Sequence, residues 1–256
     1  MEIDKLKLGN FTLSENAKNS LIASALGTLV AEISTLPICT VKTVYQNNPS
    51  MTTKMAIQSI YNMNGFRGFF SASIPAISGQ VISTSSKYTI YEIIKNYRKT
   101  EKSNLFDNSI NGLMSGIIGS ILTHPVDCWK NFNQRGDNYT KYLGTTFREK
   151  SFFEFIKIGL YKGYSGSIGK NVALYSSLFP LNDFYKSNFD STLISAPLTT
   201  ITVSFIVQPF DYYKVVVMAG NKPKEPFRGL GLMMARSLPH FAITLYVTEL
   251  LLNKMK

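Results

Sequence analysis

The sequence predicts an all-α membrane protein with six transmembrane helices, built from three copies of one helical hairpin. Three observations lead to this prediction. Long stretches of the chain carry no charge, a proline motif recurs three times, and two further motifs recur after it in the same order. Charged residues make up 17% of the 256 residues, which is below the ~25% of ordinary soluble domains.

Six apolar stretches are candidates for the membrane-spanning helices. Four of them are close to the ~20 residues that a helix needs to cross the hydrocarbon core of a bilayer, and Glu32 is the only charge within those four. The two shorter ones each follow directly on a basic residue. In chain order the six stretches are residues 20–41, 68–86, 108–126, 171–182, 191–210 and 237–248. A soluble protein with buried helices is the alternative, but four such runs are rare in one soluble chain.

A proline closes the first, third and fifth of these stretches, and polar residues recur around it. Lysine stands five residues after each proline, and aspartate stands two residues after the second and third, whereas Cys39 takes this place in the first. Proline bends a helix, and residues three, four or seven apart share one helix face. Because ionisable residues at membrane depth face a partner or a water-filled path, we expect three polar stripes to line a lumen. The stripes consist of Glu32, Cys39, Lys42 and Gln46, of Ser120, Asp127, Lys130 and Gln134, and of Ser204, Asp211, Lys214 and Met218.

Two further motifs fix the register of the three copies. A small residue and, at a constant distance after it, an acidic residue recur with the same spacing between copies. These residues are Ala72, Gly163 and Gly229, and Glu92, Asp183 and Glu249. The copies occupy residues 14–99, 105–189 and 191–256. The third is shorter around residues 219–226, where Pro223 and Pro226 disfavour a helix. The first two have room for a short extra helix, near residues 52–64 and 151–158.

These motifs resemble those of the mitochondrial carrier family. Its threefold hallmark is a proline, an acidic residue two later, a basic residue five later and often a glutamine nine later. The resemblance covers nearly the whole chain. It implies six tilted helices in three pseudo-threefold repeats around a central cavity, with both termini on the cytosolic side. It also implies a monomeric, multi-pass transporter of the mitochondrial inner membrane that is not an enzyme and needs no cofactor or metal.

The resemblance assigns roles to the charged residues of the stripes. Asp127 with Lys214 and Asp211 with Lys42 would close the matrix side, whereas Cys39 would leave Lys130 without a partner. The expected matrix gate consists of Lys42, Gln46, Asp127, Lys130, Gln134, Asp211 and Lys214. The expected cytosolic gate consists of Glu92, Lys95, Asp183, Lys186 and Glu249, and Leu252 replaces the basic residue that would complete it.

The resemblance also places a substrate site at mid-cavity. Lys170 and Arg236 would bind anionic groups, since arginine holds a carboxylate or phosphate bidentately, and Lys87 would add a charge near the mouth. Glu32 either neutralises one of the two cations in the empty state or meets a cationic group of the cargo. The expected substrate-binding residues are Glu32, Gly79, Gln80, Lys87, Lys170, Asn171 and Arg236. The pair Lys170-Asn171 is typical of carboxylate or keto-acid carriers, but the net charge of +11 suits nucleotides equally well.

Other classes of partner and activity find little support. The basic surplus is spread over loops and helix ends, which favours anionic lipid over nucleic acid. A likeness to the family's cardiolipin-binding motif extends over Lys162, Gly163, Arg228 and Gly229. The two cysteines and two histidines lack metal-ligand spacing, and no catalytic constellation is present.

Three functions therefore stay open. The first is exchange of small anionic metabolites by alternating access. The second is a carrier-fold membrane scaffold that does not transport, which the incomplete gates suggest. The third is transport of zwitterionic, amino-acid-like substrates with Glu32 as the partner of their cationic group. The abundance of Asn, Lys, Ile and Tyr indicates an AT-rich genome of a parasite or virus, in which case the membrane would belong to host mitochondria.

Overall fold

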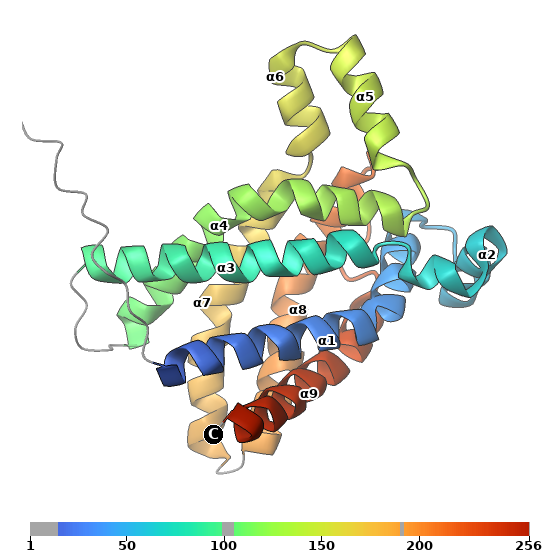
Figure 1. The fold of residues 1–256 in the computed structure, drawn as a ribbon. Helices are drawn as coiled ribbons and strands as arrows, with labels where there is room; N and C mark the ends of the chain where they lie inside the picture. Colours follow the sequence, from blue (N-terminus) through green and yellow to red (C-terminus); the bar gives the residue numbers. More distant parts are fainter. Residues whose placement is uncertain (1–14, 99–104, 190–191, 256) are drawn as a thin grey trace, which may run out of the picture.

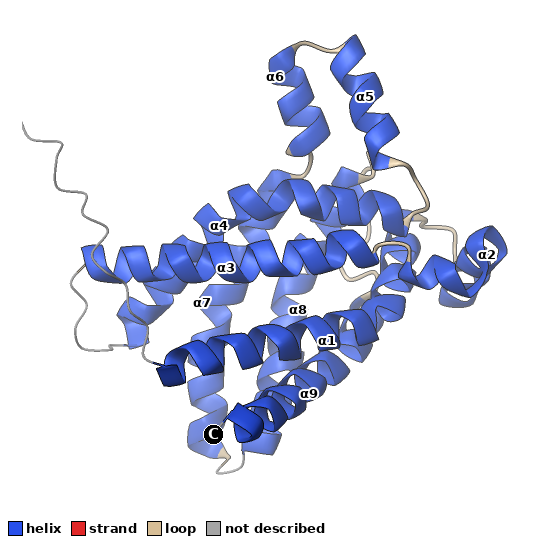
Figure 2. Ribbon diagram, in the orientation of Figure 1, coloured by secondary structure: helices blue, strands red, loops and turns tan. Residues whose placement is uncertain are grey.

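The computed structural model describes residues 15–98, 105–189 and 192–255. Residues 1–14, 99–104, 190–191 and 256 lie outside the described part of the chain. The described residues form helices joined by short loops, and none of them forms a strand (Figure 2). The prediction of an all-α protein is confirmed.

Six long helices form the body of the described chain (Figure 1). Each contacts the next long helix along the chain, and the last packs along the first, so that their contacts close into a ring. The six helices are α1 (Glu15–Asn47), α3 (Ser73–Tyr97), α4 (Leu105–Gln134), α7 (Tyr164–Asn188), α8 (Thr192–Met218) and α9 (Leu230–Met255). The three prolines of the repeated motif lie inside α1, α4 and α8, each of which continues past its proline.

The distribution of polar and apolar side chains is the reverse of that in a soluble protein. On α1, Ile22, Leu26, Val30 and Ile33 share one face, and each is at least 40% exposed. The buried residues of the long helices are in large part polar, among them Glu32, Thr35, Gln46, Asn111, His124, Ser195, Gln208 and Asp211. Exposed apolar surface of this extent marks a membrane or partner interface. The arrangement therefore favours a polar interior surrounded by lipid.

Length and hydropathy alone single out fewer spans than the sequence predicts. Among the described residues, two helical segments are long and apolar enough to cross a bilayer, Ile22–Asn47 and Leu230–Lys254. The six transmembrane helices in threefold arrangement thus stay a prediction.

Short helices follow the first and third long helices, α1 and α4. The first connection holds α2 (Thr53–Asn64), which Thr52 caps by accepting a hydrogen bond from the Met55 backbone N–H, and the 3-10 helix η1 (Gly65–Phe70). The second holds α5 (Tyr139–Glu149), α6 (Phe152–Glu154) and the π-helical η2 (Phe155–Leu160). Residues 219–229, which are all described, contain no helix. Two prolines within this segment explain why no short helix follows α8, in contrast to α1 and α4.

Helix α5 has no counterpart among the sequence-based expectations. Asn138 caps it by accepting a hydrogen bond from the Lys141 backbone N–H at 3.1 Å. Tyr139 packs with Cys128 and Phe132 of α4, and its hydroxyl donates to the Gly159 carbonyl at 2.9 Å. Burial raises the pKa of this hydroxyl. These contacts hold α5 against the end of α4, from which α5 and α6 project (Figure 1).

Candidate functional site: a central cavity and its ion pairs

A polar cavity of about 450 Å³ lies between the long helices. Six of the seven residues expected to bind substrate line it: Glu32, Gly79, Gln80, Lys170, Asn171 and Arg236. The side chain of the seventh, Lys87, lies outside the described part of the structure. The cavity is also lined by Ser120, Asp127, Lys130, Ser167, Lys214 and His240. Its charged groups are therefore four cations and two carboxylates, a net charge of +2 with His240 neutral.

Close helix packing brings these side chains together. A Cβ atom added to Gly166 of α7 would lie 2.8 Å from the Lys214 Cα of α8, so only glycine allows this approach. A Cβ atom added to Gly27 of α1 would lie 2.8 Å from the Thr244 carbonyl oxygen of α9. The first contact sets Lys170 of α7 beside α8. The second sets α1 beside the helix that carries Arg236.

Asp211 of α8 is shared by two lysines. Its Oδ2 atom accepts from Lys42 of α1, and its Oδ1 atom accepts from Lys170 of α7 at 2.6 Å. The side chains of Lys42 and Asp211 are both 7% exposed. Charges buried to this degree are costly unless they are paired. Asp211 therefore links one residue of the expected matrix gate to one residue of the expected substrate site.

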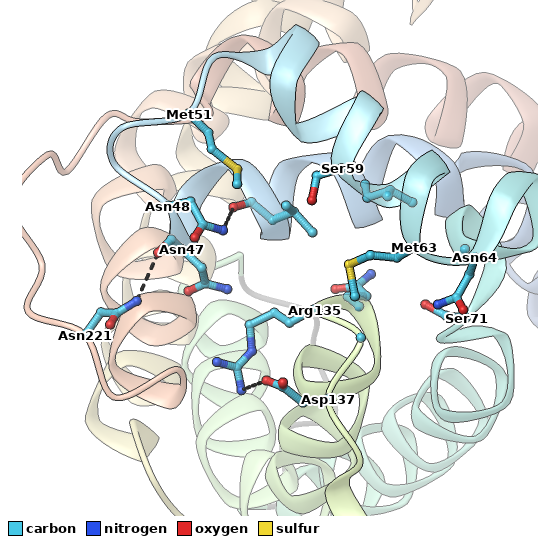
Figure 3. Close-up of a pocket in the computed structure, with 15 residues that line it drawn as sticks. Asn47, Asn48, Met51, Ser59, Met63, Asn64, Ser71, Arg135, Asp137 and Asn221 are labelled. Carbon is cyan, nitrogen blue, oxygen red and sulfur yellow. Dashed lines mark hydrogen bonds and ion pairs between the residues drawn. The ribbon is translucent and has the colours of Figure 1, made fainter.

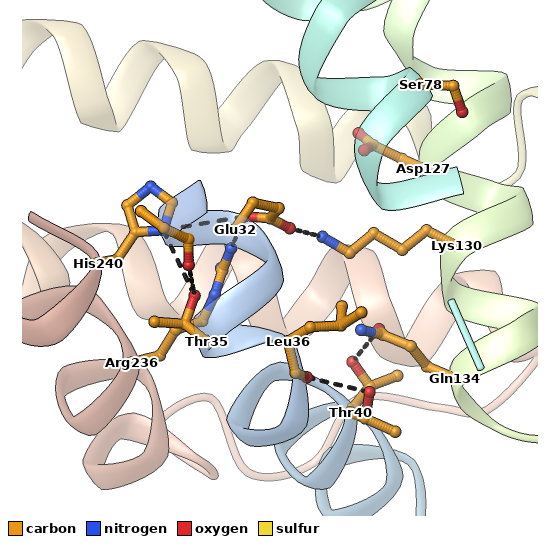
Figure 4. A network of polar contacts seen from close by, with 12 residues as sticks. Glu32, Thr35, Leu36, Thr40, Ser78, Asp127, Lys130, Gln134, Arg236 and His240 are labelled. Carbon is orange, nitrogen blue, oxygen red and sulfur yellow. Dashed lines mark hydrogen bonds and ion pairs between the residues drawn. The ribbon is translucent and has the colours of Figure 1, made fainter. Parts of the chain in front are cut away.

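Glu32 of α1 is shared in the same way (Figure 4). Its Oε1 atom accepts from Lys130 of α4, and its Oε2 atom accepts from Arg236 of α9 at 2.5 Å. The expectation that Lys130 lacks a partner is wrong, because its ammonium group reaches Glu32. His240 Nδ1 lies 4.0 Å from Glu32 Oε2 and 3.4 Å from the Thr35 hydroxyl. Of the two roles left open for Glu32, this structure contains the pairing with Arg236.

A third ion pair completes a triangle of helices. Lys214 of α8 donates to Asp127 of α4 at 2.5 Å. Together with Lys42–Asp211 and Lys130–Glu32, this pair joins α1, α4 and α8 two by two. All three pairs involve the lysine five residues after the proline of each repeat.

The two glutamines of the expected matrix gate have partners other than these ion pairs. Gln46 Nε2 donates to the Arg228 carbonyl at 3.0 Å. Gln134 Oε1 accepts from the Thr43 hydroxyl at 2.7 Å. Both glutamines are buried. They therefore connect helix ends in this structure, while the lysines and carboxylates bond to one another.

A second polar pocket of about 300 Å³ lies between the end of α1, helix α2 and the residues that follow α4 (Figure 3). Asn47 at the end of α1 and Arg135 after α4 face this space, together with Asn221 of the segment between α8 and α9. Asn221 donates to the Asn47 carbonyl at 3.0 Å, and Arg135 pairs with Asp137 at 3.0 Å. Two of the three ion pairs lie on the wall of the central cavity, and the second pocket lies further along α1 and α4.

Much of the expected cytosolic gate falls outside the description. The side chains of Glu92, Lys95 and Asp183 lie outside the described part of the structure. Lys186 and Glu249 are exposed, and no ion pair joins either of them to a described side chain. The role of these five residues stays a prediction.

The residues of the expected lipid motif lie at the starts of α7 and α9, and none of them is fully exposed. Gly163 precedes α7 with a φ of 77°, and Gly229 precedes α9 with a φ of 84°, both in the left-handed region that favours glycine. The Arg228 side chain is 7% exposed and donates to the carbonyls of Tyr45, Asn48 and Met51. This guanidinium therefore holds the end of α1, a role that the sequence did not reveal.

His240 is a cavity residue that sequence reasoning missed as a site residue. It lies on the cavity wall beside Glu32 and Thr35 (Figure 4). The signal was present, because His240 stands four residues after Arg236 and residues at this spacing share a helix face.

Comparisons with known proteins agree with the repeated motifs. The sequence profile of the family described as "Mitochondrial carrier protein" matches residues 14–102. "Mitochondrial carrier-like protein L276" of Acanthamoeba polyphaga mimivirus is 40% identical over 239 residues, which are 90% of this chain and 94% of that protein. "Mitochondrial substrate carrier family protein ucpB" of Dictyostelium discoideum is 23% identical, over 91% of this chain and 85% of its own length. "S-adenosylmethionine mitochondrial carrier protein homolog" of Drosophila melanogaster is 23% identical, over 80% of this chain and 74% of its own length.

The similarity to the viral protein covers nearly all of both chains at substantial identity. This chain belongs to the mitochondrial carrier family.

Proposed function

We propose that this carrier exchanges small anionic metabolites across the mitochondrial inner membrane by alternating access. The observation that carries the proposal is the net charge of +2 on the wall of the central cavity. Such a charge in a low-dielectric surrounding attracts anions and disfavours cations. Nucleotides and carboxylates or keto acids are the two substrate classes that fit.

Lys170 and Arg236 are the proposed contacts for the anionic groups. Each already touches a carboxylate, Asp211 or Glu32, so an anionic cargo would compete with a carboxylate of the protein for each cation. Arginine would hold a carboxylate or phosphate through two parallel hydrogen bonds. Asn171 is fixed by donating to the Gly116 carbonyl at 2.9 Å, which would hold the wall of the site in shape.

The three ion pairs between α1, α4 and α8 are the proposed matrix gate. Two of them, Lys130–Glu32 and Lys214–Asp127, lie on the wall of the central cavity. The second polar pocket follows further along α1 and α4, so a barrier formed by these pairs would separate the two spaces. Substrate that binds the open-gate state more tightly than the closed one would shift the balance toward opening. The proposed cytosolic gate, Glu92, Lys95, Asp183, Lys186 and Glu249, would then close the other end of six membrane-spanning helices.

The proposed setting is a lipid bilayer with a monomeric carrier. Cardiolipin would bind where Lys162, Gly163, Arg228 and Gly229 meet the starts of α7 and α9, since helix N-termini attract phosphate groups. The similar mimivirus protein supports a viral source, so the membrane would be that of host mitochondria.

A zwitterionic cargo is the second candidate. The Drosophila relative is named as a carrier of S-adenosylmethionine, and Glu32 offers a carboxylate on the cavity wall. Against it, both oxygens of Glu32 already accept from cations. An anion therefore fits the charges of this cavity better.

Exchange by purified protein in liposomes tests the proposal. Liposomes would be loaded with pools of nucleotides, of keto acids and carboxylates, or of amino acids, and uptake of labelled pool members would be measured. We expect labelled anions to be taken up only when the liposomes contain an anion inside. We expect Lys170→Gln to lower this uptake about tenfold. Lys157→Gln, at an exposed position of η2, is the matched control and should leave uptake unchanged. Uptake of amino acids alone would favour the second candidate, and no uptake from any pool would favour a scaffold.

A further inference from the structure

The missing acid at position 39 raises the question of what neutralises Lys130. Cys39 is 8% exposed and packs with Leu36, Ala76 and Phe70, and the charges of Arg236 and Lys130 act on it from the polar side of the helix. Lys130 instead extends toward the cavity and donates to Glu32. Glu32 is 4% exposed, which makes it a buried carboxylate with a cross-helix partner.

We propose that Glu32 has taken over the role of the acid missing at Cys39 and serves as the third carboxylate of the matrix gate. This inference rests on the proposed transport function. Position 32 lies seven residues before position 39, so both are on one face of α1, about 10 Å apart along its axis. The flexible stem of Lys130 spans this offset. The number of gate ion pairs thus stays at three, but one pair moves toward the substrate.

The displaced pair lies next to the proposed substrate site. Lys130–Glu32 lies on the wall of the central cavity, and Glu32 also holds Arg236 of the proposed substrate site at 2.5 Å. A carboxylate or phosphate group of the cargo that binds Arg236 would lie close to Lys130 as well. It would therefore compete with Glu32 for both cations. Anion binding at this corner would loosen one gate pair directly.

A simpler reading is that Glu32 serves only as the counter-ion of Arg236. In that case its contact with Lys130 is incidental, and an acid at position 39 would not replace it. Moving the carboxylate back to position 39 separates the two readings. Because Arg236 as well as Lys130 acts electrostatically on position 39, each variant is also made in an Arg236→Gln background. In that background a carboxylate can no longer serve as the counter-ion of Arg236.

The experiment compares the parent with four variants, Glu32→Gln, Cys39→Asp, the double variant Glu32→Gln/Cys39→Asp, and the uncharged control Glu32→Gln/Cys39→Asn. Thermal unfolding in detergent and exchange in liposomes are measured for each. We expect Glu32→Gln to lower the unfolding midpoint by about 5 °C and kcat about tenfold, as for the breaking of a buried ion pair. The Asp-containing double variant should recover most of both losses, and the Asn-containing one should recover neither.

The Arg236→Gln background gives a readout that separates the two readings. If Glu32 serves only as the counter-ion of Arg236, Glu32→Gln should cause no further loss there, whereas a gate role predicts that the unfolding midpoint and kcat still fall and that kcat recovers only with aspartate at position 39. Equal behaviour of the two double variants would overturn the proposal, and so would unchanged unfolding of Glu32→Gln. If the parent exchanges no anion at all, the proposed function fails, while the unfolding midpoints still decide whether Glu32 is the partner of Lys130.

Discussion

Replacing Arg228 by alanine should destabilise the fold strongly, because this side chain ties the third repeat to the first. Its guanidinium donates to the Tyr45, Asn48 and Met51 carbonyls at 2.8, 2.8 and 2.7 Å. It also lies 3.9 Å from the centre of the Tyr45 ring. Hydrogen bonds that involve a charged group contribute about 1.5–3 kcal/mol each. Since water can reach part of the freed carbonyls, we expect a total loss of about 4 kcal/mol rather than the full sum.

For a chain of this size, about 4 kcal/mol corresponds to a fall of about 10 °C in the unfolding midpoint. The measurement is thermal unfolding of the purified protein in detergent, with and without added cardiolipin. Arg228→Lys is the matched control, because it keeps the charge but loses the planar donor geometry. Its unfolding midpoint should fall about half as far as that of Arg228→Ala. The backbone carbonyl of residue 228 still accepts from Gln46 and Gln208 in both variants. The reasoning fails if Arg228→Ala unfolds like the parent without lipid and loses only the stabilisation that cardiolipin adds.

Three further substitutions test the site and the packing that builds it. Asp211→Asn leaves the buried Lys42 and the cavity-lining Lys170 without their carboxylate, so exchange in liposomes should fall at least about a hundredfold; near-parental exchange would refute the proposed gate. Arg236→Gln should raise KM for the anion about tenfold with a smaller change in kcat, and an unchanged KM would remove this residue from the substrate site. Gly166→Ala would place a Cβ atom 2.8 Å from the Lys214 Cα and should lower the unfolding midpoint by several degrees. Gly144→Ala, where nothing lies within 4 Å of the added atom, should leave the midpoint unchanged or raise it slightly.

The residues of the cavity could be predicted because helix geometry and the repeat carry the information. Glu32, Lys170 and Arg236 are far apart in the sequence, yet each has a fixed offset from a repeated motif. In a regular helix, that offset determines on which side of the helix the residue lies and how far along the helix axis it stands. Three copies of one pattern then indicate that the faces converge. The structure brings these three side chains to one cavity.

Partner choice across helices could not be predicted in the same way. The partner of Lys130 depends on the length of a flexible side chain and on where α1 lies beside α4, and neither is a property of the local pattern. Similarly, Arg228 was assigned to a lipid motif from its neighbour Gly229, although its side chain turns inward to the end of α1. Helix α5 was missed because its packing surface, the ring of Phe132, belongs to another helix.

Shared carboxylates offer a physical reason why binding and opening would be coupled in this carrier. Asp211 and Glu32 each contact one lysine across the gate and one cation of the proposed substrate site. A carboxylate with two cationic partners keeps one of them when the helices of the gate separate, so the buried charge is never left alone. Asp127, in contrast, has Lys214 as its one ion-pair partner among the described side chains. Breaking Asp127–Lys214 would therefore make the largest electrostatic contribution to the free energy of opening the proposed gate. A bound anion would compete with the two shared carboxylates for their cations.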